Sequence, residues 1–309
     1  MRGIAALAVL IFHVCLVYDL SPIFVHGWLA VDFFFALSGY VLARTYEARL
    51  HESMGPWAFT KQRFLRFWPV VLFGAAIGAP YVLAAYPLFD AIAILGLNSL
   101  LIPYFKDSEL FPVNGPFWSL FYELFANILH AFLLSRLDNR KLMGLVLACG
   151  VGMTMMGFFH GGLSLGTHTD TFAAGFVRVT LSYGIGVLLF RWWRDRPPIR
   201  VAWPWTVLLG ALLLVGRDPL GGFVPQLLFM LVGVPLVIAG GLRWKTRLSA
   251  LGALSFPLYA AHLPVVFYCA TFGVHPVLAA AISIAVASLY LALEKRLRVQ
   301  ALDSPRRLG

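Results

Sequence analysis

Long apolar runs recur along this 309-residue chain, and they constrain its fold more than any other feature. A helix needs about 20 apolar residues to cross a bilayer. Hydrophobic residues make up 60% of the sequence and charged residues only 12%, which a soluble domain does not sustain throughout. The sequence therefore predicts an all-α, polytopic integral membrane helical bundle. The runs lie near 3–20, 27–45, 68–86, 88–103, 116–135, 142–159, 172–191, 201–215, 223–241, 252–272 and 274–293.

Basic residues in the loops between these runs predict the topology, because Lys and Arg stay on the cytoplasmic side. If every basic cluster is cytoplasmic, the loops 44–67 and 136–141 share one side, although three runs separate them. The run at 88–103 is short and starts close to Asp90, so we expect a re-entrant or interfacial segment there. The clusters are Arg44, Arg49, Lys61, Arg63 and Arg66; Arg136, Arg140 and Lys141; Arg191, Arg194, Arg196 and Arg200; Arg243, Lys245 and Arg247; and Lys295, Arg296, Arg298, Arg306 and Arg307.

Ten transmembrane helices remain, and both termini are then cytoplasmic. We expect residues 1–293 to form one transmembrane domain and 294–309 a short basic cytoplasmic tail, in a multi-pass protein of the cytoplasmic (inner) membrane. Every Lys and Arg except Lys106, Arg178 and Arg217 then faces the cytoplasm. Topology thus accounts for the net charge of +10, and we expect no nucleic-acid partner.

The three cysteines give no sign of a metal site or a disulfide framework. Cys15, Cys149 and Cys269 all lie within apolar runs, and their spacing is not that of metal ligands. We expect them to be small packing residues, and we expect no metal. The first run lacks a clear small-residue cleavage site, so we expect no cleavable signal peptide.

Five ionisable side chains lie inside the expected spans, where each costs roughly 2.5–3.5 kcal/mol to insert. They are His13, Asp32, Glu123, Arg178 and His262. At ~1.5 Å per residue, three of them, His13, Asp32 and Glu123, lie roughly 7–10 Å below the outer boundary, while His262 is nearer the midplane. Their common depth predicts a single buried polar site. We expect Arg178 to pair with Asp170 or with an acidic group in the bundle.

The first run, "RGIAALAVLIFH", carries a cation at one end and a titratable ring at the other. At ~100° per residue, eleven steps place Arg2 and His13 on one helix face, about 16 Å apart. Arg2 could hold an anion at the cytoplasmic boundary, and His13 suits proton transfer. Alternatively, Arg2 snorkels and His13 hydrogen-bonds within the bundle.

The cytoplasmic stretch "FTKQRFLRFWP" places Arg63 and Arg66 on one helical face at i and i+3. Two interpretations stay open. The stretch is an amphipathic interfacial helix with Lys61 adding charge, or its Arg pair is an anion clamp, because guanidinium groups match phosphate oxygens.

At these residues the sequence resembles the acyltransferase 3 family of integral membrane acyltransferases. "RGIAALAVLIFH" is similar to the family's Arg-x10-His signature, and "RFLRFWP" to its Arg-x-x-Arg motif. "GWLAVDFFFALSGYVLA" resembles its second helix, "FWSLFYELFANIL" its W-S-L-x-x-E element, and "SFPLYAAHLPVV" its S-Y-P-L-Y-x-x-H-x-P helix, with Phe256 in place of Tyr. Five motifs in the family's order cover nearly the whole chain.

The resemblance implies transfer of an acyl group, usually acetyl from acetyl-CoA, to an extracytoplasmic carbohydrate or glycolipid acceptor at the bilayer. The acyl-CoA is a donor substrate, and no permanently bound cofactor is expected. Under this hypothesis Arg2, Arg63 and Arg66 hold the coenzyme A phosphates. His13 is the general base, or the nucleophile that accepts the acyl group. Asp32 or Glu123 orients the His13 ring, as in hydrolase triads.

Four further residues fall within the resembling motifs. Ser119 lies four residues before Glu123 and could hydrogen-bond to it. We expect Trp118, Ser119, Tyr259 and His262 to line the acceptor path or to give structural support. Two departures from the family stand out: Met1 directly precedes Arg2, and the sequence ends at residue 309 without the hydrolase-like domain that some members carry. We therefore expect the membrane domain to complete the transfer.

Two other classes of function stay open. The first is a transporter or flippase for an anionic or lipid-linked sugar, and the second is a scaffold subunit of an envelope-polysaccharide complex. The sequence does not name the acceptor, the acyl chain or the oligomeric state.

Overall fold

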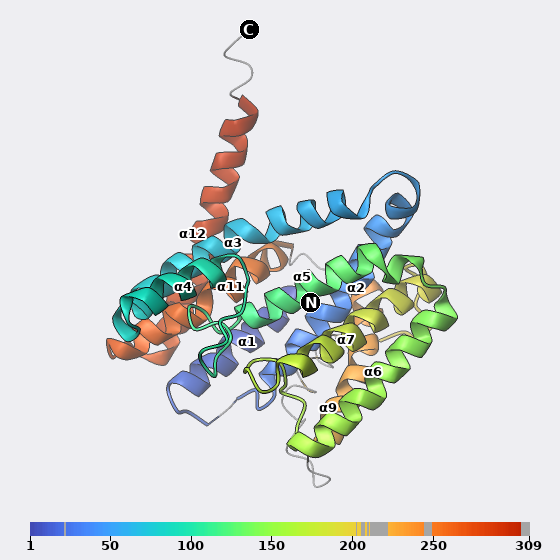
Figure 1. The fold of residues 1–309 in the computed structure, drawn as a ribbon, viewed down its shortest axis with the longest axis horizontal. Helices are drawn as coiled ribbons and strands as arrows, with labels where there is room; N and C mark the ends of the chain where they lie inside the picture. The colour runs from blue at the N-terminus through green and yellow to red at the C-terminus, as the bar shows by residue number, and fades with distance from the viewer. Residues whose placement is uncertain are drawn as a thin grey trace.

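The computed structural model describes residues 1–21, 23–201, 203–204, 208, 210, 222–243 and 249–303, and within them every regular element is a helix (Figure 1). The expected span 201–215, the basic residues Lys245 and Arg247, and residues 304–309 fall wholly or largely outside this description. The helices are α1 (Arg2–Val17), η1 (Gly27–Leu29), α2 (Ala30–Glu52), α3 (Pro56–Ala85), α4 (Leu88–Ser99), α5 (Phe117–Phe132), η2 (Leu134–Arg136), α6 (Asn139–His160), α7 (Phe172–Trp193), α9 (Val224–Leu228), the π-helical turn η3 (Phe229–Gly233), α10 (Val234–Arg243), α11 (Ser249–Thr271) and α12 (Pro276–Asp303).

Eight helical stretches in the described residues are long and apolar enough to cross a membrane. This confirms a helical multi-pass membrane protein. With 16 residues, α1 is shorter than these eight stretches, so its crossing stays a prediction, as does that of 201–215. The eight stretches are Gly27–Glu52, Pro56–Ala85, Phe117–Arg136, Asn139–His160, Phe172–Trp193, Val224–Arg243, Ala250–Thr271 and Pro276–Leu297.

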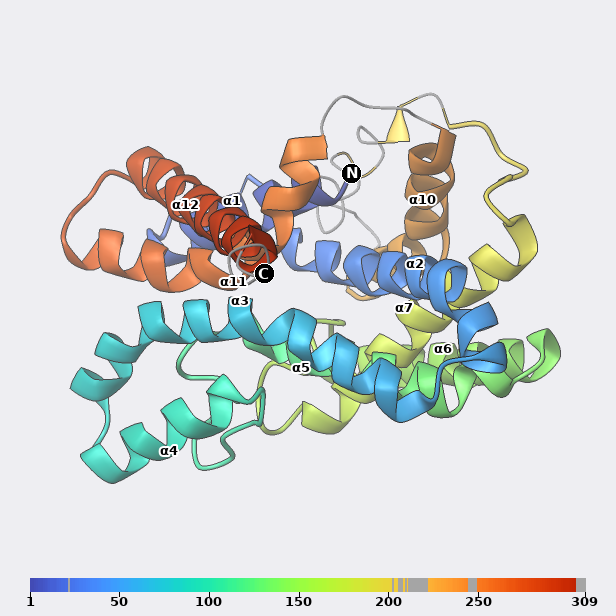
Figure 2. The same cartoon turned by 90° about the horizontal axis from the view of Figure 1, so that it is seen from above.

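The segment at 88–103 turns back on the side of the bundle from which it starts. Its helix, α4, has 12 residues and is about 18 Å long, well short of the ~30 Å hydrocarbon core. Asp90, near its start, accepts hydrogen bonds from Tyr104 (2.8 Å) and Lys106 (3.2 Å) on the returning chain. Both cartoon views place α4 alongside the end of α3 (Figures 1 and 2). The segment thus does not cross the bundle, as its charge pattern predicts.

Among the described helices, α3 and α12 extend furthest beyond the apolar runs that predict them. The run expected at 68–86 is part of α3, which begins at Pro56 and continues through Pro69 and Pro80. The Arg stretch and the candidate span are therefore one 30-residue helix. The last helix, α12, continues past residue 293 to Asp303, and its final turns project from the bundle (Figure 1).

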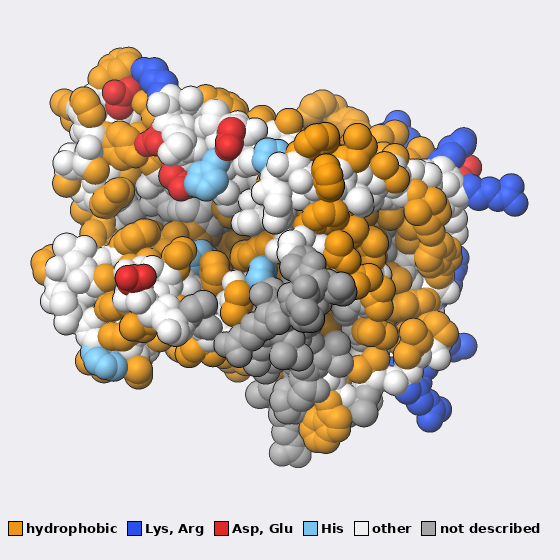
Figure 3. Space-filling view, turned by 90° about the horizontal axis from the view of Figure 1, so that it is seen from below, with side chains coloured by type: hydrophobic (Ala, Val, Ile, Leu, Met, Phe, Trp, Pro, Cys, Tyr) orange, Lys and Arg blue, Asp and Glu red, His pale blue; other side chains and the backbone are white. Residues whose placement is uncertain are grey.

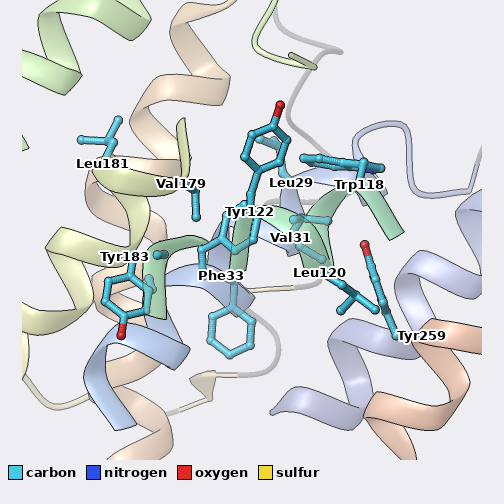
Figure 4. Close-up of a cluster of buried hydrophobic side chains, with 14 of the residues drawn as sticks. Leu29, Val31, Phe33, Trp118, Leu120, Tyr122, Val179, Leu181, Tyr183 and Tyr259 are labelled. Atoms are coloured by element: carbon cyan, nitrogen blue, oxygen red, sulfur yellow. The ribbon is translucent and has the colours of Figure 1, made fainter. Parts of the chain in front are cut away.

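The centre of the bundle is a contact between α2 and α7 that requires two glycines. A Cβ atom at Gly39 would collide with the carbonyl oxygen of Tyr183, and one at Gly186 would collide with that of Ala36. Because both positions lack a Cβ atom, the two backbones approach closely. Side chains of α2, α5 and α7, among them Phe33 and Tyr122, meet in the apolar core beside this contact (Figure 4).

Ion pairs and surface charge distinguish the two ends of the bundle. Arg191 at the end of α7 bonds to Glu47 at the end of α2 (2.7 Å) and to the carbonyl of Leu134, just after α5. These three helix ends therefore lie on one side, as the topology requires. In Figure 3 most Lys and Arg side chains gather at one end of the face, several acidic side chains lie toward the other, and apolar side chains cover much of the surface between them.

Candidate active site

One face of α2 forms one wall of a partly open cavity of about 160 Å³. The step from Val31 to Tyr46 along this face is fifteen residues, or about 22 Å. The lining residues recur at intervals of three and four, the spacing of a single helix face. The cavity is therefore long and narrow. From α2 it is lined by Val31, Phe34, Phe35, Leu37, Ser38, Val41, Leu42, Thr45 and Tyr46.

Three guanidinium groups line this cavity. Arg2 comes from the start of α1, and Arg63 and Arg66 come from the N-terminal part of α3. Arg2 and Arg66 are exposed, whereas Arg63 is only 6% exposed and lies 5.4 Å from the centre of the Phe67 ring. Its Nε is buried and has no hydrogen-bond partner within the part of the chain that the structure describes. The structure thus brings together the three cations that the motifs single out.

The carboxylate of Glu123 lies in the same cavity as the arginines. It accepts a hydrogen bond from the Ser38 hydroxyl (2.7 Å), and it lies close enough to Arg2 and Arg63 to attract both. It makes no hydrogen bond to His13 among the described residues, so the expectation that it orients that ring is wrong. The motifs did not single out Ser38. The sequence feature that could have indicated it is a hydroxyl side chain within an apolar helix, and the structure shows that this hydroxyl faces Glu123.

Tyr259 and Ser119 line the end of the cavity where α5 begins. Their hydroxyl oxygens are 2.7 Å apart, and Ser119 also donates to the carbonyl of Pro116 (3.0 Å). The expected hydrogen bond from Ser119 to Glu123 is therefore absent. Trp118 does not line the cavity. It packs edge-to-face against the ring of Phe35, which does line the cavity.

A histidine pair lies just beyond this end of the cavity. His13 on α1 and His262 on α11 approach with 3.1 Å between His13 Nδ1 and His262 Nε2. His262 is 1% exposed, and its ring centre is 5.9 Å from that of Tyr259, which lines the cavity. The two residues are 249 positions apart in the sequence, so no local pattern predicts their contact. His13 thus lies near the end of the cavity, with the Tyr259 and His262 rings between.

Asp32 does not lie at the histidine pair. Its carboxylate accepts two hydrogen bonds from Arg178, at 3.0 and 2.7 Å, and one from Ser182 at 3.1 Å. Asp32 is 0% and Arg178 1% exposed, and both bond within the α2–α7 contact. The prediction that Asp32 orients His13 is therefore wrong. Common depth in the membrane did not mean that the two side chains face each other.

Arg178 is the partner of the buried Asp32 carboxylate. Its guanidinium also donates to the carbonyl of Leu165 (3.0 Å) and lies between the rings of Trp28 and Trp118, at 4.9 and 5.2 Å from their centres. Of the two pairings expected for Arg178, Asp170 is excluded and an acidic group of the bundle, Asp32, is found. The cluster is a complete, internally satisfied ion pair.

These elements define what the site can do. The guanidinium groups favour an anion, the α2 face can accommodate an extended chain, and the histidine pair supplies a proton acceptor near the far end of the cavity. Among the described residues, no group of three or more His, Cys, Asp or Glu side chains is placed to hold a metal ion.

Comparison with known proteins agrees with the motifs. Residues 1–293 match the family model for an acyltransferase domain of the acyltransferase 3 type. The chain is also similar to a protein of Rhizobium radiobacter described as "Protein 2 in picA locus", with 34% identity over 149 residues that cover 42% of this chain and 77% of that protein. No solved structure matches the chain.

Proposed function

The chain belongs to the acyltransferase 3 family and is an acyltransferase; we propose that it moves an acetyl group from acetyl-CoA to a hydroxyl of an extracytoplasmic or envelope carbohydrate. The donor binds from the cytoplasm and the acceptor from the other side. Ten crossings in the cytoplasmic (inner) membrane, with α1 and the segment 201–215 as two of them, belong to this proposal.

The observation that carries the proposal is the cavity with three guanidinium groups in its wall. Coenzyme A combines several phosphate groups with a long, uncharged thioester arm. Guanidinium groups bind phosphate oxygens through paired, charge-assisted hydrogen bonds, and Arg2, Arg63 and Arg66 offer three of them. The arm then extends along the α2 face toward Tyr259.

In the proposed reaction, His13 is the general base. It takes the proton of the acceptor hydroxyl as that oxygen attacks the thioester carbonyl, and the resulting tetrahedral intermediate expels the coenzyme A sulfur as a thiolate. The thiolate then takes the proton from His13, so acceptor ester and free coenzyme A are formed with no net change in protons. Acyl transfer through His13 as a nucleophile is the variant of this mechanism.

The two carboxylates have other roles in this proposal. Glu123 is a counter-ion that offsets the repulsion between the arginine side chains and so holds them in the cavity before the donor binds. Asp32 holds α2 against α7 through Arg178. Neither carboxylate contacts the reacting atoms.

A purified sample in lipid nanodiscs tests the proposal. The wild-type protein should consume acetyl-CoA and release free coenzyme A in the presence of envelope carbohydrate. The variant His13→Gln should lose at least ~100-fold of this rate, because general base catalysis is worth 10²–10⁴-fold, and should still bind coenzyme A. The matched control is His160→Gln, the same substitution at the exposed end of α6, which should be fully active.

Two results would reject the proposal. One is an absence of thioester turnover by folded wild-type protein, together with sugar movement across the bilayer, which would indicate a transporter. The other is wild-type turnover by His13→Gln. The acceptor itself can be identified by mass spectrometry of envelope glycans from a deletion strain.

A further inference from the structure

The imidazole rings of His13 and His262 contact each other between two helices that pack side by side, α1 and α11. The ring centres are 4.9 Å apart, and α1 packs along α11 over much of its length. His262 is almost completely buried, whereas His13 is only partly buried. A buried ring nitrogen needs a hydrogen-bond partner, so the partners of the four nitrogens determine which ones carry protons.

The partners of His262 fix its tautomer. Its Nδ1 lies 3.0 Å from the carbonyl oxygen of Leu258 and 2.9 Å from that of Tyr259. Carbonyl oxygens only accept, so Nδ1 must carry a proton and donate it. In the neutral ring the other nitrogen, Nε2, then has a free lone pair. That lone pair faces Nδ1 of His13 at 3.1 Å.

The partners of His13 complete the assignment. Its Nδ1 lies 3.0 Å from the carbonyl oxygen of Val9, one turn earlier in α1, and therefore also carries a proton. This single N–H group is shared between the Val9 carbonyl and the lone pair of His262. The Nε2 atom of His13 is left unprotonated. It makes no hydrogen bond among the described residues, and it is not one of the buried unpartnered atoms.

We infer that His262 is the positioning residue of the reaction: it accepts the Nδ1 proton of His13 and thereby presents His13 Nε2 as the base. The inference rests on the proposed function and deepens it. In hydrolase triads a carboxylate has this role, because it holds the imidazole in one tautomer and orientation. Here a neutral ring has it, since the carboxylates of Asp32 and Glu123 are bonded elsewhere.

A neutral partner suits the surroundings of this pair. Apolar side chains of the helices that carry the pair, α1 and α11, form a core cluster with α12, among them Leu10, Leu258 and Val266. A buried carboxylate there would need its own compensating cation, whereas a second imidazole needs only the two helix carbonyls that it already has. When His13 Nε2 takes a proton, its positive charge is shared through Nδ1 with the His262 lone pair and the Val9 carbonyl.

Substitutions at His262 test this role. The amide oxygen of Gln can take the place of Nε2 as an acceptor, so His262→Gln should keep kcat within about tenfold of the wild type. His262→Leu removes the acceptor, and kcat should fall about 100-fold, within the range that acid–base groups contribute. The KM for acetyl-CoA and the calorimetric affinity for coenzyme A should not change, because the arginines are intact. His160→Leu is the matched control on α6 and should keep full activity.

A second measurement does not depend on activity and reads the tautomer of the wild-type protein, with one variant used only for assignment. The ¹⁵N chemical shifts of ring-labelled histidine in wild-type protein distinguish the two neutral tautomers, with His13 assigned from the signal lost in His13→Gln. We expect the Nδ1–H form for His13. Equal activity of the Leu and Gln variants, or an Nε2–H tautomer of His13, would overturn the inference. An inactive wild type that shows the Nδ1–H form would reject only the proposed function.

Discussion

The ion pair between Asp32 and Arg178 makes a strong prediction about stability. We consider three variants: Asp32→Leu, Arg178→Met, and the double variant. In the first, the guanidinium of Arg178 keeps the Leu165 carbonyl but loses its counter-charge in a site that is 1% exposed. In the second, the Asp32 carboxylate keeps only the Ser182 hydroxyl. Each single variant therefore leaves an uncompensated buried charge.

The expected magnitudes follow from that burial. Removing one partner of a buried pair costs about 3–5 kcal/mol, whereas replacing both by apolar residues of similar size is often neutral or better. The double variant also loses the cation–π contacts to Trp28 and Trp118, each worth about 0.5–2 kcal/mol. Contact of the thioether sulfur introduced by Arg178→Met with these rings recovers part of that loss. We therefore expect the double variant to be destabilised by no more than about 3 kcal/mol, well below the sum of the two single effects.

Denaturant unfolding in detergent micelles, followed by far-UV circular dichroism, measures the four free energies of the cycle. The coupling energy between the two sites should be at least about 3 kcal/mol, at the upper end of values for residues in contact. Single effects that add within about 0.5 kcal/mol would refute the reasoning, since the charges would then be solvated or compensated elsewhere. If the double variant is stable but has lost acyl transfer, the pair is needed to orient α2 and not only for stability.

Three further predictions concern the cavity and the topology. Arg63→Ala and Arg66→Ala should each weaken coenzyme A binding by about 1.5–3 kcal/mol, the value of a charge-assisted hydrogen bond. Lys at either position should restore the affinity only in part. Unchanged calorimetric affinity in the double Ala variant would mean that the two arginines only determine topology. Leu37→Trp should narrow the cavity midway and raise the KM for acetyl-CoA without unfolding the protein, and an unchanged KM would place the donor elsewhere. In a cysteine-free background, Ser53→Cys should be labelled only from the cytoplasm and Ser164→Cys only from outside; labelling from the same side would exclude the ten-helix topology.

The arginine end of the site could be predicted from the sequence because local features determine where these residues lie. Arg63 and Arg66 share a face by helical spacing alone, and the charge rule places both at the cytoplasmic end with Arg2. Likewise, Asp90 and the shortness of the 88–103 run, together with the parity of the crossings, predict that this segment does not cross, and the returning contacts of Tyr104 agree.

The rest of the site could not be predicted, because it depends on how each helix is rotated about its axis. Depth follows from counting residues, and on depth alone Asp32, Glu123 and His13 are equivalent. Rotation follows from packing between distant segments, and it directs these three side chains to α7, to the arginine cavity and to α11, respectively. A single sequence contains little information about such contacts.

The rotation of α2 connects the ion pair to the cavity. At ~100° per residue, Asp32, Ala36 and Gly39 lie on one face of α2, and this is the face that bonds and packs against α7. The cavity-lining face, which includes Ser38 and Leu42, is centred roughly 130° away around the same helix. A turn of α2 that separated Asp32 from Arg178 would therefore also move the wall of the donor cavity. We therefore expect the buried pair to affect acyl transfer at a distance, by fixing the orientation of the helix along which the proposed donor arm lies.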